Sequence, residues 1–374
     1  MIYFDNAATG GYKPSSVYDS ASSVMRFLCA NPSRSSHRLA ISGSKIVYSA
    51  RCAIAKAFNS APERVVFTKN CTEALNIAIT SSLKKGGHVI TTVYEHNSVL
   101  RPLFTLKDLY NLEIDVVAPI NGQSLSELIK KKIQKNTCLI VMTSISNVTG
   151  EVLNFKEVGK IASEFNIPFI VDGAQGGGHV EIDMQSDHID YLALAGHKGL
   201  YGIMGSGALV FSEKVFPKPI MFGGTGSDTF SLVQPLEIPE NLEVGTVNLP
   251  AIAALKEGVL YSSKNIKHFN VELTKITQKI IDGLKEIKDL TLYSLPNPSG
   301  IVSFKSSKID SIEFSDILNK KYDIAVRGGF HCAPLIHKHL KTDRVGLVRI
   351  SASVHNSASE VNHLIRSIEK ICKD

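Results

Sequence analysis

Two short apolar segments in the middle of the chain are each followed by a residue that could do chemistry. Residues 167–172 read Ile-Pro-Phe-Ile-Val-Asp and end at Asp172, and residues 189–194 precede Ala-Gly-His-Lys, which ends at Lys198. Such runs suit buried parallel strands, and in parallel sheets functional groups gather beyond the carboxyl ends of the strands. A lysine there can bond to an aldehyde, and a carboxylate can pair with a protonated ring nitrogen. Pyridoxal phosphate (PLP) requires both groups, so the two residues predict a site for it.

Both residues also have ordinary structural interpretations. Aspartate is a favoured helix N-cap, and most lysines lie in solvent. The setting of Lys198 favours a functional role, because Gly196 and Gly199 flank it and glycine lets the backbone approach a bound ring closely. Transfer of a lysine out of bulk water also lowers its pKa, which favours the reactive neutral amine.

A phosphate site is indicated where another strand ends. Residues 70–73, Asn-Cys-Thr-Glu, lie between an apolar segment at 65–68 and a helical pattern at 72–83. Free backbone N–H groups at the start of a helix can bind an anion, although the same segment could be a simple capping turn. His96 follows the apolar segment at 88–92 in the same way, and its alternative is a structural histidine.

The elements that would position these residues alternate along the chain. From about residue 65, apolar segments are separated by helical segments, which favours a parallel sheet covered by helices. Strands are expected at residues 65–68, 88–92, 114–118, 138–143, 167–172, 189–194 and 208–211. A short Gly-rich connection precedes the last of them, so we expect it to run antiparallel. One or two long helices over 251–290 and strands at 301–304 and 346–350 indicate a smaller α+β unit.

Size and composition exclude several classes of protein. A length of 374 residues favours two domains, and 44% hydrophobic with 20% charged residues is ordinary for a globular protein. We expect no transmembrane helix, because no apolar run is long enough, and no secretion signal. The net charge of +6 is not concentrated in a basic stripe with stacking aromatics, so no nucleic-acid role is expected. Six scattered cysteines fit reduced thiols and a cytoplasmic location.

Several motifs, taken together, resemble a known family. The chain is similar to class V, fold-type-I PLP enzymes, and within them to cysteine desulfurases of the branch that includes selenocysteine lyases. The similarity runs from Phe4-Asp-Asn-Ala-Ala-Thr9 to Val348-Arg-Ile-Ser-Ala-Ser353. It implies an α/β fold-type-I PLP-dependent transferase, with a mostly parallel seven-stranded sheet and helices on both faces. A large PLP-binding domain (12–250), a small α+β C-terminal domain (251–374) and an N-terminal segment (1–11) near the active site are expected.

The resemblance assigns cofactor roles to individual residues. Lys198 would bond covalently to PLP, Asp172 would keep the ring nitrogen protonated, and His96 would stack on the ring and assist proton transfer. The other residues that match cofactor contacts are Cys71, Thr72, Gln175, His197 and Thr246. In the family the residue matching Thr246 comes from the opposite subunit, so a homodimer is implied.

The resemblance also assigns the substrate site and the reactive thiol. Arg349 and Asn147 match residues that bind the substrate α-carboxylate, and Arg327 and Arg34 are further candidates for anion binding. The most specific match, Val326-Arg-Gly-Gly-Phe-His-Cys-Ala-Pro334, contains the family's reactive cysteine as Cys332. It implies conversion of L-cysteine to L-alanine, with a persulfide formed on Cys332 and passed to an acceptor such as an iron–sulfur scaffold or a sulfurtransferase. Without the match, Cys332 would be interpreted as a buried core cysteine.

Other interpretations of the sequence stay open. Selenocysteine lyase activity would use the same fold and carboxylate site, with L-selenocysteine as substrate, and a class V aminotransferase would not need Cys332. Related proteins carry Ser or Thr where this chain has Ala195, so a catalytically poor PLP-binding scaffold is a further alternative. His331, His337 and His339 lie near Cys332, but their spacing matches no zinc pattern, and we expect no metal site.

Overall fold

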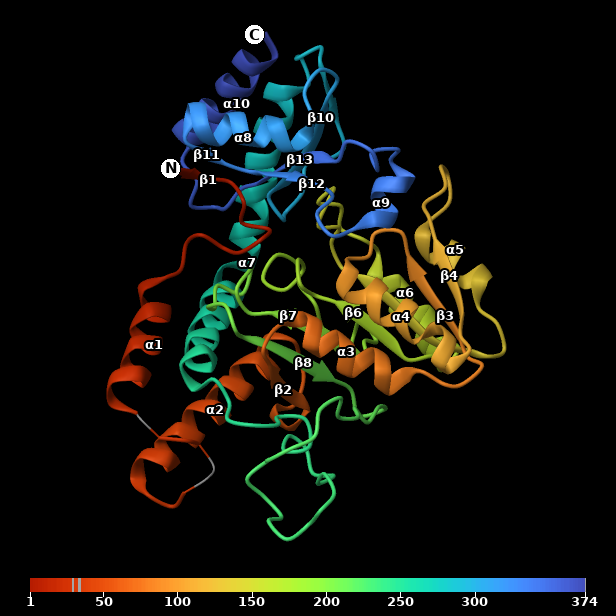
Figure 1. The fold of residues 1–374 in the computed structure, drawn as a ribbon, viewed down its shortest axis with the longest axis vertical. Coiled ribbons are helices and arrows are strands. Elements are labelled where there is room, and N and C mark those ends of the chain that lie inside the picture. Colours follow the sequence, from red (N-terminus) through yellow and green to blue (C-terminus); the bar gives the residue numbers. More distant parts are fainter. Residues whose placement is uncertain (29, 33–34, 374) are drawn as a thin grey trace.

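A seven-stranded sheet lies at the centre of the computed structural model, which describes residues 1–28, 30–32 and 35–373 (Figure 1). In spatial order the strands are β2 (Val65–Thr68), β8 (Gly207–Phe211), β7 (Tyr191–Ala195), β6 (Phe169–Asp172), β5 (Thr137–Thr143), β3 (His88–Thr92) and β4 (Glu113–Val117). β8 is antiparallel to both of its neighbours, and the other pairs are parallel. The mostly parallel sheet and its antiparallel strand at 207–211 are confirmed, with bounds shifted by one or two residues.

Helices cover both faces of this sheet because the strands are apolar on both sides. One face packs against α3 (Cys71–Ser82) and α4 (Asn97–Tyr110), and Leu75 of α3 and Val141 of β5 share one apolar cluster. The opposite face packs against α2 (Arg38–Ala57), α5 (Leu125–Lys132) and α6 (Phe155–Glu164), and Ile54 and Ile140 share a second cluster. Alternate residues of β5 therefore point to different cores, as the two-residue period of a strand requires.

A second, four-stranded antiparallel sheet is built from the C-terminal part of the chain. Its strands, in spatial order, are β12 (Arg327–Gly329), β13 (Leu347–Ser351), β10 (Ile301–Ser306) and β9 (Leu290–Leu292). The helices α8 (Ser311–Tyr322) and α10 (Ala358–Lys373) pack beside it, and the short α9 (Pro334–His339) follows β12. The expected sheet strands near residues 301–304 and 346–350 are both present.

The N-terminal segment packs on this second unit, far from its own sequence neighbours. β1 (Ile2–Tyr3) pairs in parallel with β11 (Ile324–Ala325), and Phe4 is fully buried in the core around β10 and β13. Burial of a phenylalanine side chain contributes about 1.5–3 kcal/mol, which anchors the segment. Residues 5–9 then pass toward the large sheet and α1 (Ser15–Phe27) follows (Figure 1).

One long helix connects the two units. The range 251–290 was expected to form one or two helices, and most of it lies in the single helix α7 (Leu249–Leu284). A short 3-10 helix, Pro62–Arg64, directly precedes β2. The first half of α7 packs with α1 and α2, and its last turns pack in the C-terminal core. We therefore propose that the boundary between a large domain (12–250) and a small domain (251–374) lies near residue 250, with α7 contributing to both. None of the helices in the described part of the chain combines the length and apolarity needed to cross a membrane.

Candidate active site

A cavity of about 250 Å³ opens where β5, β6 and β7 end. The parallel strands deliver their carboxyl ends to this edge of the sheet, as expected for a parallel α/β sheet. Residues of the second sheet and of the N-terminal segment close the cavity from the other side. The predicted site residues that line it are Cys71, Thr72, His96, Asn147, Asp172, Gln175, His197, Lys198, Arg327 and Arg349.

Asp172 is a buried and fixed carboxylate at the end of β6. Its side chain is 2% exposed, and its Oδ1 accepts hydrogen bonds from the Ala174 N–H at 2.8 Å and from the Cys71 Sγ at 3.5 Å. Among the described residues, both of its side-chain hydrogen bonds fall on Oδ1. The other oxygen is therefore free to pair with a donor in the cavity.

Lys198 lies within the turn that follows β7. Burial lowers the pKa of its amine, while the nearby Asp172 charge opposes that shift. The flanking glycines also have a reason within the protein itself. A Cβ on Gly196 would lie 2.2 Å from the Ser206 Oγ, and one on Gly199 would lie 2.4 Å from the Gly177 carbonyl oxygen. These glycines are required by protein packing around Lys198, independently of any bound ring.

The start of α3 forms one polar end of the cavity. Asn70 caps the helix, since its Oδ1 accepts from the Glu73 N–H at 2.9 Å, and the Thr72 Oγ1 lies 2.9 Å from the Ser98 Oγ. His197 contributes a buried Nδ1 with no hydrogen-bond partner in the described structure. Burial lowers the pKa of His197 to about 4, so its ring is neutral at pH 7. A helix N-terminus, a hydroxyl pair and an unpartnered ring nitrogen fit a phosphate group.

His96 is the N-cap of α4, and its hydrogen bonds determine its tautomer. Its Nδ1 accepts from the Ser98 N–H at 3.0 Å and lies 2.8 Å from the Ser98 Oγ. Burial lowers the pKa of His96 to about 4, so the ring is neutral and carries its proton on Nε2. The ring is thus held as a neutral donor at the wall of the cavity.

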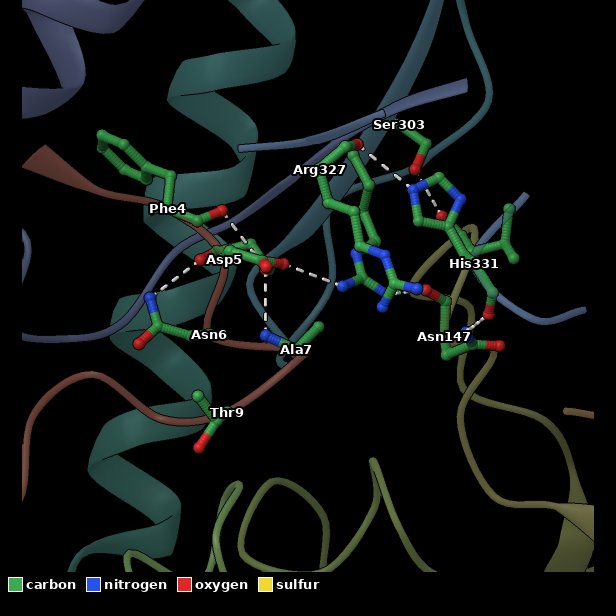
Figure 2. Close-up of polar contacts among 12 residues, drawn as sticks. Phe4, Asp5, Asn6, Ala7, Thr9, Asn147, Ser303, Arg327 and His331 are labelled. Carbon is green, nitrogen blue, oxygen red and sulfur yellow. Dashed lines mark hydrogen bonds and ion pairs between the residues drawn. The ribbon is translucent and has the colours of Figure 1, made fainter. Parts of the chain in front are cut away.

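Arg349 of β13 brings a buried positive charge into the same cavity. The side chain is 1% exposed, and it donates to the Asp5 Oδ1 at 2.9 Å and to the Asn147 carbonyl oxygen at 3.0 Å. Its Nε has no partner in the described structure. Figure 2 labels Asp5 and Asn147, the two residues that accept these hydrogen bonds. Gln175 also bonds the N-terminal segment, through the Ala7 carbonyl oxygen at 3.0 Å.

Cys332 lies outside the cavity wall but next to it. Its thiol is exposed, and Arg327, which lines the cavity, donates from Nη2 to the Cys332 Sγ at 3.9 Å. Thr246 is exposed, does not line the cavity of this chain, and bonds Asn31 at 3.4 Å. Arg34 lies outside the described residues. No group of histidine, cysteine, aspartate and glutamate side chains suited to a metal ion occurs in the described ranges.

Comparison with known proteins places these residues in a family, because residues 2–364 match the aminotransferase class-V family. The chain belongs to that family. It is 31% identical to a probable cysteine desulfurase of Pyrococcus abyssi, over 100% of this chain and 94% of the relative. A probable cysteine desulfurase of Methanothermobacter thermautotrophicus is also 31% identical, over 99% and 94%. The apo structure of a cysteine desulfurase from Thermococcus onnurineus superposes with a TM-score of 0.92 at 32% identity, covering 100% of this chain and 94% of that one.

Three polar residues of this class V site were not predicted from the sequence. Asp5 pairs with Arg349, Ser98 connects Thr72 and His96, and Glu95 is fully buried beside the end of β5. Ser98 is the second residue of α4, and its N–H donates to the side chain of the N-cap His96. The partner of Asp5, Arg349, is distant in the sequence, and Glu95 bonds the distant Thr143 as well as the nearby Thr92, so no local pattern identified either residue.

Proposed function

We propose that this chain is a PLP-dependent cysteine desulfurase that converts L-cysteine to L-alanine and keeps the sulfur as a persulfide on Cys332. One observation carries the proposal: an exposed thiol lies beside Arg327 at the edge of the cavity that contains Lys198 and Asp172. The full-length similarity to desulfurases supports it. An aminotransferase has no need of a thiol at that position.

The residues present fit PLP. The α3 N-terminus with Thr72 and the unpartnered His197 nitrogen would hold the phosphate, and Asp172 would pair with the ring nitrogen. Lys198 would bond to the aldehyde carbon, and His96 would contact the ring. When bound, PLP supplies an electron sink for the electron pair released at the substrate α-carbon.

The remaining groups bind the substrate and move its proton and sulfur. Arg349 would bind the α-carboxylate, since a guanidinium can donate two parallel hydrogen bonds to it. Lys198, whose pKa burial lowers, would accept the α-proton at Nζ as a neutral amine. The Cys332 thiolate would then form an S–S bond to the substrate sulfur while the substrate C–S bond breaks, and protonation of the remaining carbon skeleton yields alanine.

A homodimer and a sulfur acceptor belong to the same proposal. Thr246 would act in the cavity of a second copy, because it is exposed and does not line the cavity of its own chain. The preceding loop exposes large apolar side chains, which supports a partner surface there. These side chains are Phe222, Phe230, Leu232, Val233 and Leu236. The exposure of Cys332 suits delivery of the persulfide sulfur to another protein.

The test is to mix the PLP-loaded protein with L-cysteine and a thiol reductant and to measure alanine and sulfide. We expect equal amounts of both products, and loss of both in Cys332→Ala. Cys52→Ala, which alters a partly buried thiol on α2, is the matched control and should retain activity. Amino transfer that depends on a keto acid and persists in Cys332→Ala would instead identify an aminotransferase.

A further inference from the structure

The segment that carries Cys332 has an unusual backbone. His331 and Cys332 have φ angles of 51° and 56°, so two consecutive non-glycine residues lie in the left-handed region. Side chains of L-residues are disfavoured there, and such conformations persist only where surrounding contacts enforce them. The segment therefore requires contacts that hold it in place.

Two hydrogen bonds hold this pair of residues. The Asn147 side-chain amide donates to the His331 carbonyl oxygen at 2.8 Å, and the Asn97 backbone N–H donates to the Cys332 carbonyl oxygen at 2.7 Å. We call these two bonds the cysteine clamp, and Figure 2 shows the first of them. The donors follow β5 and β3 of the large sheet, whereas the acceptors follow β12 of the small sheet. The clamp thus joins the two sheets across the edge of the cavity.

The packing around the segment leaves the thiol as its exposed part. The His331 ring is 2% exposed and stacks on the His337 ring with 5.8 Å between centroids, and Ala333 is fully buried. Cys332 lies exposed between these two buried neighbours. With both flanking side chains buried and both carbonyls bonded, the direction of the Cys332 side chain is determined by the clamp.

We propose that Asn97 and Asn147 are positioning residues that hold Cys332 in the orientation required for sulfur transfer. The inference rests on the proposed desulfurase function and adds a role that differs from substrate binding. The Asn147 side-chain amide donates to the segment that carries Cys332, and the Asn147 backbone carbonyl oxygen accepts from Arg349 at 3.0 Å. It therefore connects the arginine proposed to bind the carboxylate with the segment proposed to receive the sulfur.

Asn97 allows a clean test because its donor can be removed without disturbing the helix. Asn97 is the first residue of α4, where the N–H has no partner within the helix and proline is well tolerated. The preceding His96 is extended, with φ −73° and ψ 157°, which is the conformation that a following proline favours. Asn97→Pro deletes the N–H of the clamp, and Asn97→Ala is the matched control that keeps it.

The experiment compares the PLP-loaded wild type with both variants. Loss of one hydrogen bond to a strained segment should lower kcat for alanine formation by about fivefold or more, with KM for L-cysteine within about twofold of wild type. Amide hydrogen exchange in residues 329–334 should become at least about fivefold faster in Asn97→Pro and stay at the wild-type rate in Asn97→Ala. Equal kcat and equal exchange in the two variants would overturn the proposal.

Hydrogen exchange and a second variant keep the result decisive. Hydrogen exchange does not depend on catalysis, so accelerated exchange in a protein without desulfurase activity would support the clamp and reject the proposed function. If Asn97→Pro fails to fold, Asn147→Asp replaces it, because a carboxylate cannot donate to the His331 carbonyl. A lower kcat and faster exchange support the clamp for that variant. A higher KM with unchanged kcat and exchange would show that Asn147 binds the carboxylate and does not position the thiol.

Discussion

Glu95 offers a quantitative test of how the site is buried. Its side chain is 0% exposed, and its Oε1 accepts from the Thr92 hydroxyl at 2.5 Å and from the Thr143 N–H at 3.2 Å. Its Oε2 has no partner in the described structure. Burial raises the pKa of Glu95 to about 8, and the charge on Asp172 adds to that effect. Glu95 should therefore be a neutral carboxylic acid at pH 7.

The magnitude follows from the two pKa values. The unfolded chain releases the proton near pH 4.5, whereas the folded protein keeps it up to about pH 8. The stabilising contribution of the bound proton is complete below pH 4.5 and is lost as the pH rises to about 8, at about 1.4 kcal/mol per pH unit. Between pH 5 and pH 7 this amounts to roughly 2–3 kcal/mol. Glu95→Gln has no proton to lose and should lack this fall.

The assay is urea unfolding of the wild type and Glu95→Gln at several pH values and one protein concentration. The free energy of unfolding of the variant, relative to wild type, should rise by roughly 2–3 kcal/mol from pH 5 to pH 7. Any constant cost of placing an amide there cancels in this comparison. Glu313→Gln, at an exposed position in the first turn of α8, is the control and should give a curve parallel to wild type. A flat difference for Glu95→Gln would refute the argument, because Glu95 would then be ionised in the folded protein.

Three further substitutions test other parts of the site. Lys198→Ala should abolish both the absorbance of the covalently bound cofactor and alanine formation, and retained turnover would contradict its assignment. Ala195→Ser restores a hydroxyl at the cavity wall and should tighten PLP binding by about two- to tenfold in a spectroscopic titration. Asp5→Asn leaves the buried Arg349 without its ion-pair partner and should lower the free energy of unfolding by about 2–3 kcal/mol, measured by urea denaturation at pH 7.

The large sheet was predictable because all of its strands except the edge strand β4 are buried on both faces. Such strands appear in a sequence as continuous apolar runs, and all seven runs correspond to strands of the structure. Their bounds differ by one or two residues, since strand ends depend on neighbouring strands. Asp172 is the last residue of β6 and Lys198 follows β7, so strand order alone brings both to one edge of the sheet.

The contacts between distant segments were not predictable in this way. Asp5 and Arg349 are separated by 344 positions and Asn147 and His331 by 184, and no local pattern signals either pair. The close packing of Gly196 against Ser206 and of Gly199 against Gly177 was not predictable either, because it appears only once the chain is folded.

The order of the elements, the family motifs and the chemical groups at the strand ends can be inferred from the amino-acid sequence, because they depend on local periodicity and residue type. Which of those groups are charged, paired or restrained depends on the folded arrangement. Desolvation, ion pairing and backbone strain depend on what surrounds an atom, as the pKa of Glu95 and the left-handed Cys332 demonstrate.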